Sequence, residues 1–125
     1  MEGHAAKAIL VVEDDSQVRR FVARVLRAEG YVVLEASCGR EGLETFTSHG
    51  EKRIAVIITD VLLPNMSGPE MIDRILTLAP AVGVVFMTGD MAGASLWDGL
   101  HSRSILLRKP FTRAALIEAI RRFGR

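Results

Sequence analysis

The sequence predicts one α/β domain in which a five-stranded parallel sheet is doubly wound, with helices on both faces. Short apolar runs rich in β-branched residues alternate with amphipathic helical segments, which is the pattern of successive right-handed βαβ units. The run that begins at Ile54 is apolar, apart from Thr59, until it reaches Asp60. Such a run is expected of a central strand that is buried on both faces. A length of 125 residues fits a single domain.

The first unit is a short strand followed by an amphipathic helix. Ala8 to Val12 is apolar throughout and is followed at once by three carboxylates. Asp15 or Ser16 can cap the next helix, and Gly30 ends it. The apolar residues expected to face the sheet are Val18, Phe21, Val22, Val25 and Leu26. The opposite face is interpreted as solvated, with a partner-docking surface as the alternative, and it carries Arg19, Arg20, Arg24 and Arg27.

The following units repeat this alternation. Further strands are expected at residues 31–36, 54–60, 82–87 and 104–107. A helix over residues 39–48 would direct Leu43 and Phe46 inward. Ser67 with Glu70 three residues later forms a capping box for the next helix, which ends at Pro80. Its expected buried stripe consists of Met71, Ile72, Ile75 and Leu76.

The last two predicted helices differ in how strongly their sequences favour a helix. A fourth helix over residues 91–100 contains Gly93 and Gly99, each of which costs about 1 kcal/mol relative to alanine, so this helix is expected to be short or mobile. Thr112 caps the final helix. The residues of that helix expected to face the core are Leu116, Ile120 and Phe123.

Charge and composition exclude several classes of function. Sixteen basic and fifteen acidic side chains nearly cancel, so neither direct nucleic-acid binding nor binding to an anionic membrane is expected. The apolar runs are too short to span a membrane, and the N-terminus lacks the pattern of a signal peptide, so a cytoplasmic location follows by default. Cys38 is the only cysteine, and we interpret it as a small residue at a strand-to-helix junction.

Carboxylates follow two of the predicted strands. Glu13, Asp14 and Asp15 come directly after the first strand, and Asp60 ends the third. If the chain crosses over in both directions from its first strand, these two strands are neighbours and their carboxylates share one crevice. Two unit charges about 4 Å apart repel by roughly 4 kcal/mol at an effective dielectric near 20, so a cation must offset them. Oxygen ligands alone favour Mg²⁺.

The same edge of the sheet is expected to carry the other groups that phosphoryl transfer to an aspartate needs. Asp60 would supply the attacking oxygen. Mg²⁺ and Lys109, which follows the fifth strand, would neutralise the phosphoryl oxygens. Thr88 ends the fourth strand, where its hydroxyl could donate a hydrogen bond to the new phosphoryl group, and Gly89 would leave room for that group to enter.

Four stretches, in order and each at a strand end, give the chain its resemblance to a known family. They are VVEDD at residues 11–15, ITDVLLPNMSG at 58–68, MTG at 87–89 and LRKPF at 107–111. Over roughly residues 8–123 the chain resembles the CheY-like receiver domain of two-component response regulators. The resemblance implies a flavodoxin-like sheet in the order 2-1-3-4-5, with a receiver domain over residues 8–125 after a tail over residues 1–7.

The resemblance also implies the chemistry and the partners. Asp60 would accept a phosphoryl group from a histidine kinase or a histidine phosphotransfer protein, and the modified chain would bind a downstream target that the sequence does not identify. Mg²⁺ would be held by Asp14, Asp60 and the backbone carbonyl of Leu62, and Glu13 would reach it through water. The peptide bond from Lys109 to Pro110 is expected to be cis. Apart from its own phosphorylation and dephosphorylation, no turnover of a substrate is expected, so the chain is not classed as an enzyme.

One position departs from the family pattern. Receivers place an aromatic residue on the fifth strand that turns inward after phosphorylation, whereas this chain has Leu106 there, three residues before Lys109. We therefore expect a different readout, such as ordering or displacement of the fourth helix. A homodimer through the fourth and fifth helices is a further alternative, which Leu106 and the two glycines do not favour.

Other functions remain as alternatives. A receiver-like chain could act as a phosphorylation-independent interaction module, although Asp14, Asp60, Thr88 and Lys109 are all present. An aspartate-dependent phosphatase would need an Asp-x-Asp pair after the first strand, which the residues Glu13, Asp14 and Asp15 do not provide. A nucleotide-binding enzyme would need a glycine-rich loop at that position. Within the receiver reading, the chain is either a stand-alone regulator or the receiver of a hybrid histidine kinase.

Overall fold

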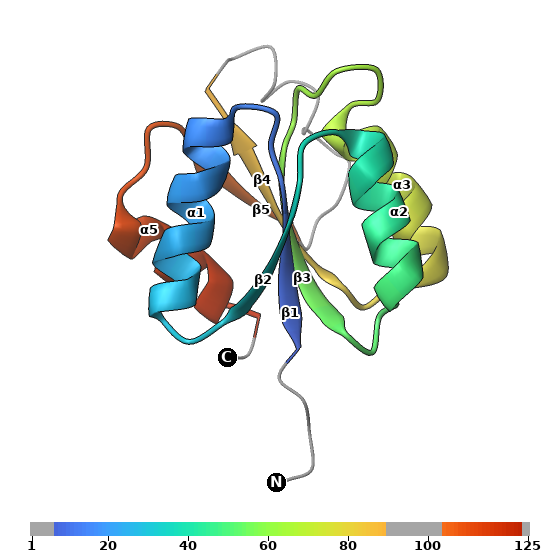
Figure 1. The fold of residues 1–125 in the computed structure, drawn as a ribbon, viewed down its shortest axis with the longest axis horizontal. Coiled ribbons are helices and arrows are strands. Elements are labelled where there is room, and N and C mark those ends of the chain that lie inside the picture. Colours follow the sequence, from blue (N-terminus) through green and yellow to red (C-terminus); the bar gives the residue numbers. More distant parts are fainter. Residues whose placement is uncertain (1–6, 90–103, 124–125) are drawn as a thin grey trace, which may run out of the picture.

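A five-stranded parallel sheet lies at the centre of the computed structural model, which describes residues 7–89 and 104–123 (Figure 1). Its strand order is β2-β1-β3-β4-β5, so β1 and β3 are neighbours. The predicted fold class and strand order are therefore confirmed. The strands are β1 Ala8–Val12, β2 Val32–Ala36, β3 Ile54–Asp60, β4 Gly83–Thr88 and β5 Ile105–Arg108.

Two layers of helices cover the sheet. In Figure 1, α1 and α5 lie on one face, and α2 and α3 lie on the other. The helices are α1 Ser16–Ala28, α2 Gly39–His49, α3 Gly68–Leu78 and α5 Arg113–Arg121. The fourth helix predicted over residues 91–100 lies outside the described residues.

Side chains cap the described helices at the positions where the sequence places hydrogen-bond acceptors. Asp15 caps α1, with its Oδ1 accepting a hydrogen bond from the Gln17 amide at 2.9 Å. Thr112 caps α5 in the same way. The Ser67 hydroxyl caps α3 and accepts from the Glu70 amide at 3.1 Å. Because each cap pairs an otherwise unbonded amide, these polar residues set where the helices begin.

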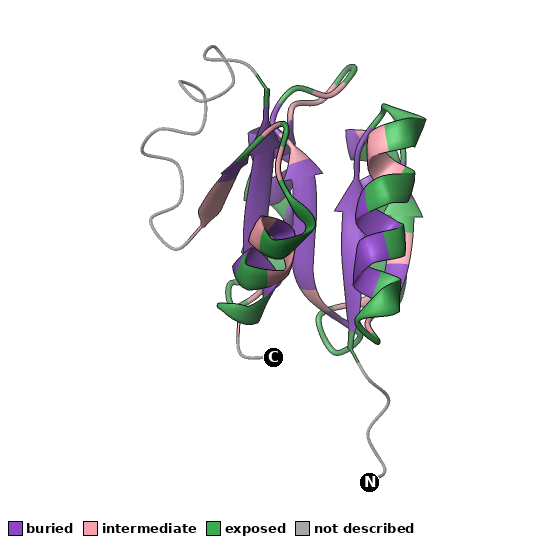
Figure 2. Cartoon of the chain, turned by 90° about the vertical axis from the view of Figure 1, so that its left-hand side faces the viewer, coloured by how far each residue is buried: buried purple, intermediate pink, exposed green. Residues whose placement is uncertain are grey.

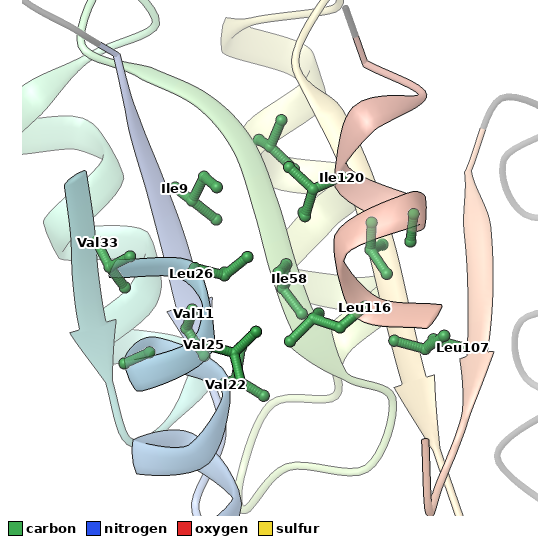
Figure 3. Packing of buried hydrophobic residues seen from close by; sticks show 14 of the residues in the cluster. Ile9, Val11, Val22, Val25, Leu26, Val33, Ile58, Leu107, Leu116 and Ile120 are labelled. Carbon is green, nitrogen blue, oxygen red and sulfur yellow. The ribbon is translucent and has the colours of Figure 1, made fainter. Parts of the chain in front are cut away.

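Alternate residues of the strands pack into two separate cores. Ile9 and Val11 of β1 face α1 and α5, and Leu10 and Val12 face α2 and α3. Figure 3 shows the first core, in which Leu26 of α1 and Leu116 of α5 pack toward Ile58 of β3. Burial on both faces explains why β1 and β3 read as continuous apolar runs rather than as alternating patterns. Figure 2 shows this burial along the strands, with the outer helix faces exposed.

One side chain of the predicted inner stripe of α1 does not face the core. Phe21 is 39% exposed, so its predicted burial is wrong, and its ring lies 6.3 Å from that of Phe111, measured between ring centroids. The helical turn carries Phe21 to the edge of the apolar stripe, beyond the reach of the sheet. Phe123, which was also expected to face the core, is half-buried and packs over Gly83, where any Cβ atom would lie 2.5 Å from its ring.

Candidate functional site

The strand register gathers the predicted site residues at the carboxyl edge of the sheet. Val12 of β1 pairs with Thr59 of β3, so the residues that follow each of them lie side by side. Asp60 in turn pairs with Met87, the residue before Thr88. Thr88 pairs with Arg108 at the end of β5, and its carbonyl accepts a hydrogen bond from the Lys109 amide at 2.8 Å. Four strand ends thus deliver their polar residues to one crevice.

Glu13 is the most firmly held residue of the site, and only 1% of its side chain is exposed. Its amide donates to the Ala36 carbonyl at 3.0 Å, and its own carbonyl accepts from Arg19 Nη1 at 2.9 Å. Its Oε1 accepts from Lys109 Nζ at 2.8 Å, and its Oε2 accepts from the Asp15 amide at 3.0 Å. Every hydrogen-bonding group of Glu13 is therefore paired, as a buried carboxylate requires.

Lys109 connects Glu13 to Asp60. Its Nζ lies 2.8 Å from Glu13 Oε1 and 2.8 Å from Asp60 Oδ2. The side chains of Lys109 and Asp60 are 23% and 13% exposed, so both pairs are partly shielded from water and are charge-assisted hydrogen bonds. One ammonium thus holds the carboxylates of two neighbouring strands together.

The pKa values of Glu13 and Lys109 are shifted by burial and by the hydrogen bonds of Lys109 to Glu13 and Asp60. Burial raises the pKa of Glu13 to about 7, although the hydrogen bond from Lys109 opposes that rise. Burial acts to lower the pKa of Lys109, but its hydrogen bonds to Asp60 and Glu13 outweigh burial and raise it above its usual value. Both groups therefore favour their protonated forms, Glu13 because it is buried and Lys109 because it binds two carboxylates.

The donor set fits a hard divalent cation. One carboxylate oxygen from each of Glu13, Asp14 and Asp60 lies within 4.8 Å of the others. Asp14 is exposed, and its carboxylate has no hydrogen-bond donor within residues 7–89 and 104–123. Three carboxylates against one lysine leave two negative charges when all of them are ionised, and a divalent ion would balance these. Oxygen ligands with exposed positions for water match the preference of Mg²⁺.

The loop after β3 holds Asp60 in place. The Leu62 amide donates to Asp60 Oδ1 at 3.1 Å, and the Val61 amide donates to the Met87 carbonyl at 3.0 Å. Asn65 has a φ of 69°, a left-handed conformation that asparagine tolerates. Gly68 donates to the Val61 carbonyl at 2.9 Å and lies so close to Asp60 that a Cβ atom would collide with the Asp60 carbonyl. The loop therefore turns back directly over the aspartate.

The remaining predicted residues surround this centre. Thr88 is buried at the end of β4, and Gly89 beside it is exposed. A Cβ atom on Gly89 would point to the side chain of Lys109, 3.6 Å from its Cβ. The peptide bond between Lys109 and Pro110 is cis, as expected from the sequence.

Leu106 lies on β5 beside Phe86 and packs against the core under α2 and α3. Its neighbour Leu107 faces the opposite core, under α1 and α5. An aliphatic side chain that takes part in core packing thus occupies the position at which the resemblance implied an aromatic residue.

An open groove of about 540 Å³ lies beside the site, and its existence was not expected from the sequence. Its walls come from the start of α1 and from the chain after β4 and β5, and are formed by Gln17, Val18, Phe21, Gly89, Lys109, Pro110 and Phe111. Phe21 carried a weak signal in the sequence, since it stands at the margin of the apolar stripe among arginines. The opposite wall could not be anticipated, because it depends on the path of the chain after β5.

Among the described residues, no helix combines the length and the apolar character that a membrane crossing requires.

Known proteins show the same organisation. Residues 9–121 match the family described as the response regulator receiver domain. The chain is 32% identical over 115 residues to the response regulator receiver protein CpdR of Brucella abortus (strain 2308). The alignment covers 91% of this chain and 93% of CpdR.

Two solved structures add to this similarity. A receiver domain protein from Clostridium thermocellum superposes with a TM-score of 0.82 at 34% identity, covering 95% of this chain and 94% of that one. The receiver domain of the hybrid histidine kinase CckA superposes with a TM-score of 0.80 at 30% identity. The superposition covers 94% of this chain and 99% of the CckA receiver. With the sheet order and the acidic edge described above, these matches show that the chain belongs to the response regulator receiver domain family.

Proposed function

We propose that the chain is a phosphoacceptor in which Asp60 takes a phosphoryl group from a phosphohistidine donor and thereby changes which partner the chain binds. The observation that carries this proposal is the position of Asp60. It lies at the carboxyl edge of the sheet, within 2.8 Å of Lys109 Nζ and among the acidic oxygens of Glu13 and Asp14. A nucleophilic carboxylate next to a fixed cation and a divalent-ion site is the arrangement that aspartyl phosphorylation uses.

Each residue has a distinct part in the proposed transfer. An oxygen of Asp60 forms the new bond to phosphorus while the phosphorus–nitrogen bond of the donor breaks, and its electron pair returns to the imidazole. Lys109 presents positive charge to the phosphoryl oxygens. Thr88 directs its hydroxyl toward the same group from the adjacent strand end. Gly89 keeps the approach to Asp60 open.

Mg²⁺ would be bound by Asp14, Asp60 and the Leu62 carbonyl, with Glu13 acting through water, and when bound it supplies the charge that offsets the phosphoryl group. The Leu62 amide donates to Asp60 Oδ1 at 3.1 Å, so the backbone nitrogen of Leu62 lies beside the aspartate. Glu13 shares Lys109 with Asp60, which places it close to the cation without requiring a direct bond to it.

The groove beside Asp60 supplies a docking place for a protein donor. It is apolar, contains Phe21 and Phe111, and reaches Lys109 at one end. The exposed Arg20 and Arg24 of α1 lie on either side of Phe21 in the sequence. We propose that the donor presents an apolar helix with acidic residues at its margin, because such a surface matches the apolar groove and the exposed arginines of α1 in polarity and charge.

The whole-protein context is also a proposal. Residues 8–125 would form the receiver, and residues 1–7 a tail. The match to CpdR over most of its length supports a stand-alone regulator, and the similarity to the CckA receiver supports a place within a hybrid histidine kinase. In either context the donor is a histidine kinase or a histidine phosphotransfer protein, and the transfer takes place in the cytoplasm.

The direct test is intact-protein mass spectrometry after incubation with acetyl phosphate, with and without Mg²⁺. Wild type should gain one phosphoryl group only when Mg²⁺ is present, and the Asp60→Asn variant should gain none. Asp73→Asn, which changes an exposed aspartate of α3, serves as the matched control and should label like wild type. If wild type stays unlabelled while a known receiver is labelled, the chain is an interaction module that does not depend on phosphorylation.

The docking groove is tested with a histidine phosphotransfer protein selected because it labels the wild-type chain. Phe21→Ala should slow transfer from that protein and leave labelling by acetyl phosphate unchanged, because Phe21 contacts the donor and not the phosphoryl group. Leu78→Ala removes a comparably exposed side chain, 57% accessible, from the opposite layer of helices and should affect neither reaction. Equal transfer to the wild type and the Phe21→Ala variant would refute the groove as the docking surface.

A further inference from the structure

Arg19 of α1 reaches out of its helix to the acidic loop. Its Nη1 donates to the Glu13 carbonyl at 2.9 Å, and its Nε donates to Glu35 Oε1 of β2 at 3.3 Å. The side chain is only 18% exposed, although it belongs to the face of α1 that was expected to be solvated. One guanidinium therefore ties α1, β2 and the end of β1 together.

Arg27, two turns further along α1, makes almost the same pair of contacts at a different place. Its Nη1 donates to Glu35 Oε2 at 3.0 Å, and its Nη2 donates to the Val33 carbonyl at 2.9 Å. Both arginines thus share the Glu35 carboxylate, and each also binds one backbone carbonyl. The difference is that the carbonyl bound by Arg27 lies within β2, whereas the carbonyl bound by Arg19 belongs to the loop that carries the carboxylates.

We infer that Arg19 is a positioning residue for the cation site, through its hold on the Glu13 carbonyl. This inference rests on the proposed function, because it concerns the same site. The side chain of Asp14 is exposed and has no donor among the residues that the structure describes. Its location therefore depends on the backbone on either side of it.

That backbone is held at two points. On one side Arg19 binds the Glu13 carbonyl, which belongs to the peptide unit that leads into Asp14. On the other side the Asp15 amide, from the peptide unit that leaves Asp14, donates to Glu13 Oε2 at 3.0 Å. Removing the Arg19 contact frees the first point and leaves the Asp15 amide to hold the loop alone, so that hydrogen bond is expected to open more often.

The charge of Arg19 is paired with Glu35, so its effect on the cation site is expected to come from its geometry. The guanidinium binds a backbone carbonyl and Glu35 and occupies no oxygen of the Glu13, Asp14 or Asp60 carboxylates. Outer partners of this kind hold metal ligands in place, and their removal commonly weakens metal binding by about 10–100-fold. Arg19 is not expected to contact the phosphoryl group.

The test compares Arg19→Gln with Arg27→Gln, because the two variants remove equivalent contacts from one helix. The first measurement is amide hydrogen exchange in Mg²⁺-free protein. Arg19→Gln should accelerate exchange at the Asp15 amide, which is protected by its hydrogen bond to Glu13 Oε2, and Arg27→Gln should leave exchange at that amide unchanged. The second measurement is the Mg²⁺ dissociation constant, from a titration followed by ¹H–¹⁵N spectra. It should rise about tenfold in Arg19→Gln and stay within twofold of wild type in Arg27→Gln.

The outcomes separate this inference from the proposed function. Equal Mg²⁺ dissociation constants for the two variants, or unchanged exchange at the Asp15 amide in Arg19→Gln, would overturn the role of Arg19. A wild-type chain that binds no Mg²⁺ and accepts no phosphoryl group would refute the proposed function instead, and the exchange measurement would still decide whether Arg19 holds the loop. If Arg19→Gln does not fold, Arg19→Lys replaces it, since lysine keeps the charge but lacks the fork that reaches two acceptors.

Discussion

The ammonium of Lys109 lies 2.8 Å from Asp60 Oδ2, although the two residues are 49 positions apart in the sequence. The same ammonium lies 2.8 Å from Glu13 Oε1. Lys109 therefore has two tasks that are separable by experiment. Without a divalent ion it is the counter-charge that keeps the two carboxylates together, and in the proposed phosphorylated state it is the cation that contacts the phosphoryl group.

Lys109→Ala is expected to destabilise the Mg²⁺-free protein by about 1–3 kcal/mol, because it leaves a buried carboxylate without its charged partner. Mg²⁺ should recover part of this loss, since the metal site remains. Urea denaturation in EDTA and in Mg²⁺ measures both values. An equal loss under the two conditions would show that the cation does not compensate for the lysine. The variant should still accept a phosphoryl group, but its affinity for the partner of the phosphorylated form should no longer change.

Gly68→Ala is expected to destabilise the protein by about 1–3 kcal/mol and to slow labelling of Asp60. The new methyl group would collide with the Asp60 carbonyl, so the loop after β3 must move. Gly89→Ala is the comparison, because its methyl group would make only ordinary contacts with Lys109, at 3.6 and 3.7 Å. Stability in this second variant should stay within about 0.5 kcal/mol of wild type, while labelling slows because the approach to Asp60 is narrower. Thermal denaturation measures the stability of the Gly68→Ala and Gly89→Ala variants, and acetyl phosphate labelling measures how fast each accepts a phosphoryl group at Asp60.

Leu106→Ala should reduce stability by about 1–3 kcal/mol, less than for a fully buried leucine, because Leu106 is only partly buried against the core under α2 and α3. The rate of Asp60 labelling should not change, since this side chain faces the core rather than the acidic site. Denaturation and labelling carried out on the same preparation check both expectations. A slower rate of labelling would mean that Leu106 contributes to the site as well as to the core.

Glu41 provides a pH-dependent contribution to stability. Hydrogen bonds from the Ser37 amide and from the Ser37 hydroxyl lower the pKa of this carboxyl below its ordinary value of 4.5. A lowered pKa in the folded state stabilises the protein above pH 4.5, and this stabilisation is lost as the pH falls through the folded-state pKa. The stability difference between wild type and Glu41→Gln should therefore be full at pH 7 and should shrink as the pH falls below 4.5. Urea denaturation across that range measures it, and a constant difference would contradict this assignment.

The sequence predicted the strands well because their signals are local. β1 and β3 are continuous apolar runs that end in carboxylates, and burial on both faces requires such runs. Asp15, Ser67 and Thr112 cap helices where they were expected to, because capping depends on residues within one turn. The co-location of Asp60 and Lys109 also follows from local signals, once the strand ends are known to share one edge.

The contacts that decide the details of the site were not predictable in the same way. Arg19 looked like one more arginine on a solvated face, and only the position of β2 shows that Glu35 lies within its reach. Glu13 was expected to act on a cation through water, whereas the structure also makes it a buried partner of Lys109. Phe21 satisfied helical spacing but lies beyond the sheet. Each of these depends on distances between elements far apart in the sequence.

The position of Glu35 has a further consequence, for self-association. β2 lies at one edge of the sheet and is only five residues long, and an exposed edge strand invites pairing with another copy of the chain. Glu35 stands near its middle and is held by Arg19 and Arg27, so a second β2 strand approaching in parallel would bring a like charge beside it. A short edge strand with a fixed charge disfavours growth of the sheet from one molecule to the next. The ion pairs that anchor α1 therefore also help to keep the folded chain from aggregating through its open edge.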